Sequence, residues 1–592
     1  MKNKKIIACI FCFLGMVSLT GCKKFLLQTS DTQKEAGQSF RTIEDLRAST
    51  AFLYTAPWSK FHRDVPAITD GRANNLYIDG VTGTLASISL FAESSNFVEF
   101  GVVWSGAYVA ITQSDYIIKD YVPMAIANGV DATKAKACEG EARFMRGTGY
   151  WYLAMLWHDV PIIDDPRDQV LNTIIAPNRF EDILQYAIND LTSAVELLPA
   201  TDTKGRVTKY SAKAMLARLC LTAANYAQGN RFSTDYLTRN NVGSNNELAE
   251  KYYNQVKTLT ESVITESSYD ILDDYEDLFK TQNNNNREVL FGVQYPSGLT
   301  DADLRNAVSE KLAYNAEVTG NLANSSSLFV SYDMLKWFVD DGALSRLRGS
   351  VCIPGQNYSY LGTQLPAGSW TVPVSTSSRT KCSLKKYMVG STKDTDGAAV
   401  KGNSGLIPAV IRMAEVYLMY TEAAMGLTDQ TSDAKALSYF NKVRKRAFKL
   451  NINDFVPYTI VTKNTLLKER RLEFFYEGLY WPDLVRRSFY DMNWVLSFLN
   501  NKLKDSNAST EFTSWTSYSY TYDPTKYATT GGWNSSPRQQ AGYIPQQVVH
   551  NVPEGSYVHA VGAKSNIWAF PYPSIESSAN PKLNSEPVKY QF

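Results

Sequence analysis

Apolar residues recur at steps of three and four along much of the chain, which is the period of a helix face. The clearest case is 131–157, where Ala142, Met145, Gly149, Leu153 and Leu156 share one face. The same spacing predicts further helices at 41–52, 104–122, 180–198, 209–226, 248–265, 411–424, 436–447 and 466–480.

The pattern changes at about residue 272. Up to about 405 it becomes Asn- and Ser-rich, with short β-like pieces at 289–293 and 369–374, which predicts a loop-rich insert. The helices on either side resemble tetratricopeptide-type repeats in architecture, although no repeat consensus is legible. We therefore predict a mainly α fold, in which a helical-repeat scaffold at 41–271 and 406–592 carries the insert at 272–405 with its short β-strands.

The start of the chain has the features of a secretory signal, predicted over residues 1–21. Lysines precede an apolar run from Ile6 to Leu19, and this run is shorter than the roughly 20 residues that a membrane span needs. The stretch LTGC (19–22) resembles the lipobox of bacterial lipoproteins, in which the cysteine is joined to diacylglycerol and becomes the first residue after cleavage. We predict lipidation at Cys22, with a tether over 22–40. The alternative is an ordinary cleavage site with an incidental cysteine.

Cysteine content and charge narrow the class of protein. The chain has seven cysteines, three of them at or before the lipidation site, so no disulfide scaffold is expected in so long a chain. Cys138 and Cys220 are predicted to be small core residues. Cys352 and Cys382 flank a strand-and-turn region, and either form a disulfide or remain separate thiols. A formal net charge of +1 argues against nucleic-acid binding, which rests mainly on phosphate neutralisation.

Catalytic motifs are absent after the signal. The sequence contains no G-x-S-x-G, H-E-x-x-H or P-loop pattern. Its four histidines, His62, His158, His550 and His559, argue against a metal site built on two or three histidines. Adjacent acids such as Asp164-Asp165 point apart and do not supply the two facing carboxylates of a glycosidase. We predict a protein that is not an enzyme and that uses no cofactor and no metal.

Four segments resemble the signature blocks of the SusD/RagB family: GEARFMRGTGYWYLAMLWHDVPII (140–163), GRVTKYSAKAMLARL (205–219), PAVIRMAEVYLMYTEAA (408–424) and LLKERRLEFFYEGLYWPDLVRR (466–487). The ending IWAFPYPSIESSANPKLNSEP (567–587) resembles the family's C-terminal close. With the lipobox, the resemblance spans the whole chain in order. It implies an outer-membrane lipoprotein, facing the cell exterior, that binds a nutrient glycan and acts as the lid of a SusC-like TonB-dependent transporter.

The chain departs from the family pattern at two places. Lys23 and Lys24 follow Cys22, where surface-export signals of the family usually carry acidic residues. Trp157-His158 stands where members often have Phe-Gly before Asp-Val-Pro, and we interpret His158 as a structural turn residue.

Charged residues of the signature blocks are interpreted as ion pairs between helices. Glu469, Glu473 and Glu477 repeat every four residues and would repel one another without cations between them. We expect them to pair with arginines of the same helix and with Arg486 or Arg487.

Ligand-binding candidates follow from sugar chemistry. Sugars have apolar C–H faces flanked by hydroxyls, so their sites combine an aromatic platform with carboxylate, amide or guanidinium groups. The stretch ITDGRANNLYIDG (68–80), predicted as a turn between helices, offers the polar groups, and the insert offers aromatic residues. The candidates are Asp70, Arg72, Asn74, Asn75, Tyr77, Tyr295, Tyr314, Asn315, Tyr358 and Trp370. The alternative for the polar residues is a capped turn with solvated charges, and the alternative for the aromatic residues is packing within loops. Trp104, Trp337 and Trp481 are predicted to be core residues.

Two other functions remain open at this point. The ligand of the same transport system could be an oligopeptide, as in the RagB branch of the family, or the chain could be a helical-repeat scaffold that binds only protein. Aromatic loops round a shallow concavity favour a glycan, a deep closed polar cavity favours a peptide, and a bare groove favours the scaffold.

Overall fold

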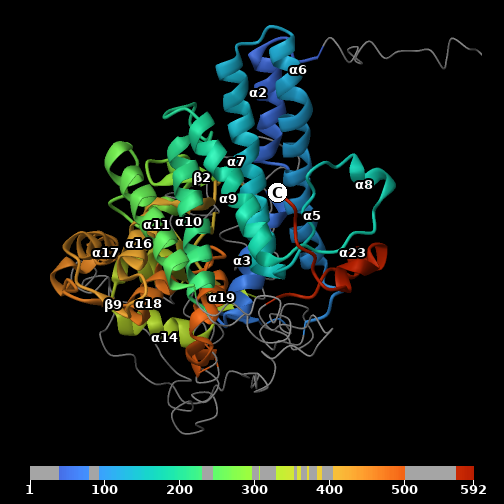
Figure 1. Ribbon diagram of the computed structural model, residues 1–592. Coiled ribbons are helices and arrows are strands. Elements are labelled where there is room, and N and C mark those ends of the chain that lie inside the picture. The colour runs from blue at the N-terminus through green and yellow to red at the C-terminus, as the bar shows by residue number, and fades with distance from the viewer. Residues whose placement is uncertain are drawn as a thin grey trace, which may run out of the picture.

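The computed structural model describes residues 39–78, 93–229, 245–295, 328–352, 356–361, 370–372, 383–389, 404–495, 497–499 and 569–592, with the single positions 88, 306, 308 and 312. This part of the chain is mainly helical, with a few short strands, as the apolar pattern predicts (Figure 1). No helix in it is long and apolar enough to cross a membrane.

Helices of the N-terminal part pack mostly against their neighbours in the sequence. Helix α7 lies against α5 and α9, and α10 lies against α9 and α11. Such stacking of successive helices is the arrangement of helical-repeat proteins. The helices are α2 (Ile43–Ala51), α3 (Ser59–Arg72), α5 (Val98–Tyr116), α6 (Val122–Ala127), α7 (Ala132–Trp157), α8 (Asp168–Leu171), α9 (Phe180–Leu197), α10 (Lys209–Gln228) and α11 (Asn246–Glu266).

The insert contains more helix than its sequence indicates. Strands β2 (Val289–Gly292) and β6 (Trp370–Thr371) form where the pattern predicts short β-pieces. Helices α14 (Tyr332–Asp341) and α15 (Leu344–Ser350) were not predicted, because each is too short to show a clear helical period. The remaining strands are β3 (Leu328–Val330), β4 (Val351–Cys352), β5 (Asn357–Tyr358) and β7 (Ser383–Leu384).

The C-terminal helices differ from prediction at one break. The stretch 466–480 was predicted as one helix, but α18 ends at Glu473 and α19 begins at Tyr480. Between them Tyr476 (φ 59°) and Gly478 (φ 78°) adopt positive φ, which a right-handed helix excludes. The other elements are β8 (Ala409–Arg412), α16 (Met413–Met425), β9 (Gln430–Thr431), α17 (Ala434–Ala447), β10 (Val461–Thr462), α18 (Lys463–Glu473), α19 (Tyr480–Tyr490) and α23 (Ser574–Ala579).

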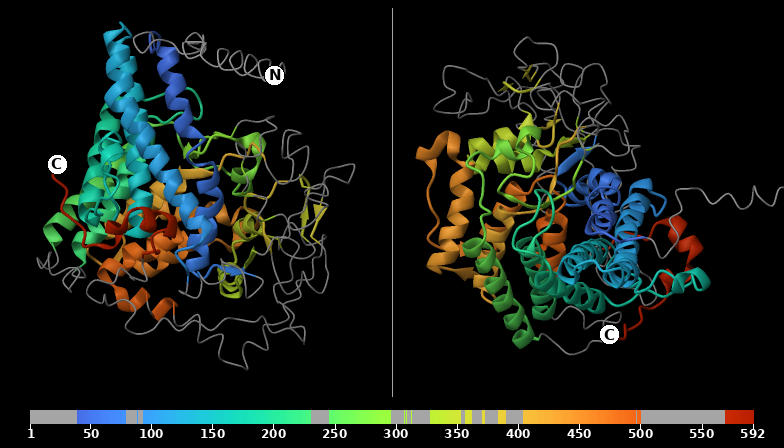
Figure 2. Two further views of the ribbon diagram at one scale, coloured as in Figure 1. Left: turned by 90° about the vertical axis from the view of Figure 1, so that its right-hand side faces the viewer. Right: turned by 90° about the horizontal axis from the view of Figure 1, so that it is seen from above.

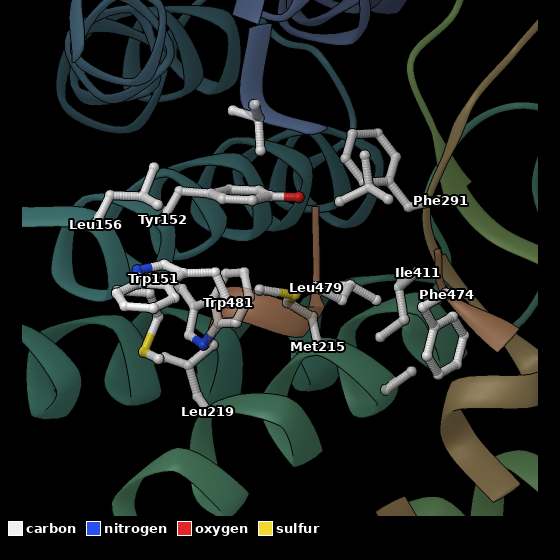
Figure 3. Close-up of a cluster of buried hydrophobic side chains, with 14 of the residues drawn as sticks. Trp151, Tyr152, Leu156, Met215, Leu219, Phe291, Ile411, Phe474, Leu479 and Trp481 are labelled. Carbon is white, nitrogen blue, oxygen red and sulfur yellow. The ribbon is translucent and has the colours of Figure 1, made fainter. Parts of the chain in front are cut away.

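One hydrophobic core joins the two helical parts. Figure 3 shows Trp151 of α7, Met215 of α10 and Trp481 of α19 gathered in it, together with Phe291 of β2. Trp104 and Trp481 are buried and Trp337 packs against the core, as predicted for these three. The N-terminal and C-terminal helices therefore fold as one scaffold.

The segment 569–592 lies along the N-terminal helices (Figure 2). The Phe570 amide donates to the Leu156 carbonyl at 2.7 Å, and Val588 bridges to Asn178.

His158, at the end of α7, has a φ of 68° and stacks on Phe180 with ring centroids 4.5 Å apart. His158 is thus a buried turn residue, as the sequence predicts.

Candidate functional site

A four-stranded sheet joins the segment after α3 to the insert. Its strand order is β1-β3-β7-β4, where β1 is Leu76–Ile78. Tyr77 of β1 stands opposite Phe329 of β3 in the antiparallel register. The Ser331 amide and hydroxyl donate to the carbonyls of Asn75 and Asn74, each at 2.9 Å. The segment after α3 and the insert, far apart in the sequence, therefore meet at one sheet.

The polar candidates of the first segment are buried in internal contacts. Residues 68–72 form the end of α3, which corrects the predicted turn. Asp70 and Asn75 are fully buried, and Asn75 Nδ2 donates to Asp70 Oδ1 at 2.8 Å. Arg471 Nε donates to Asn75 Oδ1 at 2.9 Å, and the Tyr476 amide donates to Asp70 at 3.2 Å. These side chains join α3 to the α18–α19 junction, and burial raises the pKa of Asp70 to about 6.

Arg72 is also engaged inside the protein. It forms an ion pair with Glu93, and its guanidinium carbon lies 5.4 Å from the Trp481 ring centroid and 5.3 Å from that of Phe570. A side chain held between an acid and two rings has a structural role. Asn74, with a φ of 60°, is half-buried at the turn into β1.

The aromatic candidates of the insert form a packed pair. Tyr358 and Trp370 stand opposite each other in the β5–β6 hairpin, and their rings stack with centroids 6.3 Å apart. The Tyr358 hydroxyl donates to the Arg348 and Val351 carbonyls, both at 3.0 Å. Both rings are almost fully buried, in a small apolar cluster separate from the main core. Cross-strand aromatic pairs of this kind stabilise a hairpin.

The other candidates divide into one buried residue and several that lie outside the described residues. Tyr295 is buried, and its hydroxyl donates to the Ser59 carbonyl at 3.0 Å. Tyr314, Asn315, Cys22 and Cys382 fall outside the part of the chain that the structure describes. The ligand roles of Tyr314 and Asn315 therefore stay predictions. Cys352, which lies among the described residues, is in no disulfide assigned by the structure, and its thiol donates to the Leu384 carbonyl at 3.8 Å, which favours the alternative of separate thiols.

Glutamates of the last signature block are paired, but with other arginines than expected. Glu473 accepts hydrogen bonds from Arg412 Nη1 at 2.6 Å and Arg346 Nη2 at 2.8 Å. The surrounding cluster, called here the arginine–glutamate network, contains five acids and five cations with buried side chains in mutual contact; the partly exposed Lys468 also lies 3.6 Å from Asp341 at its edge. Its members are Glu288, Asp341, Glu469, Glu473, Glu477, Arg346, Lys386, Arg412, Arg444 and Arg446.

The arginines named from the sequence bind elsewhere. Arg470 pairs with Asp483 at 2.7 Å and Arg486 with Glu422 at 2.7 Å. The expectation that they neutralise the glutamate row is wrong, because the cations of the network come from α15, the segment after β7, β8 and α17. Sequence spacing shows which charges share a helix face, but it does not show which element packs onto that face.

A groove that the sequence did not predict lies between α5, the segment 161–175 and α23, and we call it the α5–α23 groove. Its volume is about 660 Å³. Figure 1 shows α23 beside α5 and α8, on the opposite side of the molecule from α17. Residues that line it include Phe52, Trp104, Tyr108, Val109, Ile175 and Glu576.

Known protein families match both parts of the chain. Residues 222–588 match the model of the SusD family, and residues 84–221 match a model described as starch-binding associating with outer membrane. The chain belongs to the SusD family. A SusD-like protein of Bacteroides ovatus is 29% identical to this chain, and the alignment covers 100% of this chain and 99% of the relative.

Solved structures of SusD-like proteins share the fold. A crystal structure determined with a xylogluco-oligosaccharide has a TM-score of 0.72 and 28% identity, covering 92% of this chain and 99% of that chain. A laminarin-binding SusD-like protein has a TM-score of 0.58 and 20% identity, covering 78% of this chain and 93% of that chain, and supports the fold alone. The helical-repeat architecture inferred from the sequence is therefore confirmed.

Proposed function

We propose that this SusD-family protein captures an oligosaccharide at the cell surface and delivers it to a SusC-like TonB-dependent transporter, on which it acts as a lid. The observation that carries the proposal is the 28% identical structure determined with a xylogluco-oligosaccharide, since the alignment spans almost the whole of both chains. The lipobox at Cys22 supports an outer-membrane anchor.

Within this proposal, the ligand contacts belong to the end of the molecule where β1 meets the insert. Tyr77 stands on the edge strand of the sheet, and with Tyr314 and Asn315 it is retained as a ligand candidate. We assign the buried Tyr358–Trp370 pair to the packing between β5 and β6. We assign Asp70, Arg72 and Asn75 to the scaffold, because all three are buried, Asn75 contacts Arg471 and Asp70, and Arg72 pairs with Glu93.

Binding without turnover is the expected behaviour. The buried carboxylates of the scaffold are held in ion pairs or amide contacts, and a glycosidase requires two that face the scissile bond from about 5 to 10 Å apart. A stacked ring and a few hydrogen bonds give affinities of roughly micromolar to millimolar order.

The test is isothermal calorimetry of the soluble chain from residue 23 onwards with purified xyloglucan, laminarin, starch and other plant, host and microbial polysaccharides. We expect binding to one of them, weakened at least about tenfold by Tyr314→Ala, which is about 1.4 kcal/mol. Tyr252→Ala on α11, which changes a partly exposed tyrosine that belongs neither to the insert nor to the sheet of β1, is the matched control. Failure of the intact chain to bind any polysaccharide would contradict glycan capture and favour the peptide alternative.

Delivery and anchoring have separate tests. We expect the full-length protein to co-purify from outer membranes with a TonB-dependent transporter, and Cys22→Ala to move it into the soluble fraction. A Cys22→Ala protein that stays in the membrane would contradict lipidation at this residue.

A further inference from the structure

The α5–α23 groove is rimmed by exposed apolar side chains. Phe52 and Val109 line it and are both 43% exposed. Next to lining residues, Ile174 is 44% and Ile575 is 72% exposed. Large apolar side chains gathered round a concavity are typical of interaction sites, because leaving them in water costs about 25 cal/mol per Å². The groove therefore has the composition of a surface that is buried when a binding partner is present.

One wall of the groove is an extended backbone segment. Residues 172–177 run without a turn or bend into the bridge at Asn178. Thr173 and Ile175 both line the groove while Ile174 between them does not, which is the alternation of an extended chain. Among the described residues, the backbone amides of 172–176 donate no hydrogen bond, although the Ile175 carbonyl accepts one from Asn580. Such an edge can pair with an added strand.

The charge of the groove is one-sided. Glu576 is the only Asp, Glu, Lys, Arg or His among the lining residues, and no described cation pairs with it. Burial raises the pKa of its carboxyl group, because desolvation disfavours the charged form. An occupant that carries a basic group would supply the missing counter-charge.

These features favour a protein segment over a sugar. A sugar site needs open aromatic faces, and the groove offers few of them. Trp104 is only 4% exposed and packs against Trp157 with ring centroids 5.2 Å apart, and Tyr108 is half-buried, so Phe52 is the one largely exposed ring of the lining. The remaining apolar lining is largely aliphatic, which suits Leu, Ile or Val side chains.

We propose that the α5–α23 groove docks an extended segment of a partner protein, with apolar side chains at alternate positions and one Lys or Arg that pairs with Glu576. The segment lies alongside residues 172–176 and fills the space between α5 and α23. The proposal stands apart from glycan capture, because α23 and the strands of the insert lie on different sides of the molecule (Figure 2).

The test is selection from a random heptapeptide library displayed on phage against the immobilised soluble chain from residue 23 onwards. We expect enriched peptides to contain a Lys or Arg flanked by apolar residues at alternate positions. A fluorescein-labelled copy of the strongest peptide should bind Glu576→Gln at least fivefold more weakly, and Val109→Lys at least tenfold more weakly. Glu250→Gln and Ile452→Lys change an exposed acid and an exposed apolar residue elsewhere and should bind as the unchanged protein does.

Several results would overturn the proposal. Selection of no peptide, selection of acidic peptides, or equal binding by Glu576→Gln and Val109→Lys would each do so. Polysaccharide binding that disappears in these two variants would assign the groove to a glycan instead. A dimer in analytical ultracentrifugation that dissociates on Val109→Lys would assign it to a second copy of the chain.

Discussion

The carboxylates of the arginine–glutamate network are paired with cations, whereas the carboxylate of the α5–α23 groove has no described cation beside it. In the network, five acids meet five cations, so no charge is left without a partner. Burial alone would raise the pKa of the Glu473 carboxyl group. The positive charges of Arg446 and Arg412 outweigh this effect and hold the pKa well below its ordinary range. In the groove, Glu576 has no described cation and its pKa is raised. The difference separates charges that hold the fold together from a charge that remains available to a partner.

The network also shows why the insert and the helices act as one body. Arg346 and Lys386 come from the insert, and both reach glutamates of the last signature block. Buried ion pairs are costly to desolvate, so their net contribution to stability is small, but removing one member leaves an uncompensated charge. The comparison therefore predicts large effects in the network and small ones in the groove.

The largest expected effect is that of Glu473→Ala. This change removes the carboxylate shared by Arg346, Arg412 and Arg446, and leaves three buried guanidinium groups with fewer acids. We expect a loss of about 3–5 kcal/mol in the free energy of unfolding, measured by chemical denaturation. Glu250→Ala, an exposed control, should change it by less than about 0.5 kcal/mol. A loss below about 1 kcal/mol for Glu473→Ala would remove the basis of the comparison.

Lys386→Met should lower the free energy of unfolding by an intermediate amount, and the local effect should be largest in the insert. Lys386 Nζ donates to Glu477 Oε1 at 2.8 Å and to the Glu473 carbonyl at 3.1 Å, and Glu477 keeps its contacts with Arg412 when the lysine is lost. We expect a loss of about 2 kcal/mol. Hydrogen exchange should show faster opening of residues 383–389 than of α7; uniform exchange would contradict a link between the insert and the network.

Asp70 is a buried carboxylate in the scaffold that accepts hydrogen bonds from amides and, within the described part of the chain, forms no ion pair. Burial raises its pKa from 3.8 to about 6, so the native state binds the proton more tightly than the unfolded chain. Its contribution to stability is therefore present at low pH and falls as the pH rises from about 4 to about 6, by up to about 3 kcal/mol. Asp70→Asn keeps the Oδ1 acceptor and should abolish this fall, in denaturation measured at about pH 4, 5.5 and 7. A pH profile parallel to that of the unchanged protein would contradict the assignment.

The smallest effect is expected for Glu576→Gln. Because this carboxylate has no described ion-pair partner, its loss should leave the free energy of unfolding within about 0.5 kcal/mol. Thermal unfolding at two salt concentrations checks this. A destabilisation above about 1.5 kcal/mol would show that Glu576 belongs to the scaffold, and would place it on the same side of the comparison as Glu473.

Long helices could be predicted from the sequence, and the site could not. The helices predicted at 180–198 and 248–265 match α9 and α11 to within two residues at each end, because a long amphipathic stretch shows its period clearly. Helix α3 escaped prediction because Pro66 interrupts its pattern and its last residues, Asp-Gly-Arg, are typical of turns.

Burial of the polar candidates could not be predicted, because their partners are distant in the sequence. Arg471 satisfies Asn75 across 396 residues, and no local pattern indicates such a contact. The α5–α23 groove is built from four separate stretches, at Phe52, α5, 161–175 and 576–583, whose residues are ordinary in their local context. A sequence read locally shows which side chains are polar, but their exposure is decided by what packs over them.

The position of segment 569–592 sets a time order for folding. This segment donates the Phe570 amide to Leu156 and bridges Val588 to Asn178, so it completes the surface of helices made some 400 residues earlier. The N-terminal helices cannot reach their final packing until these residues have been synthesised. Long-range closure of this kind slows folding, because the chain must bring distant segments together before these contacts stabilise it.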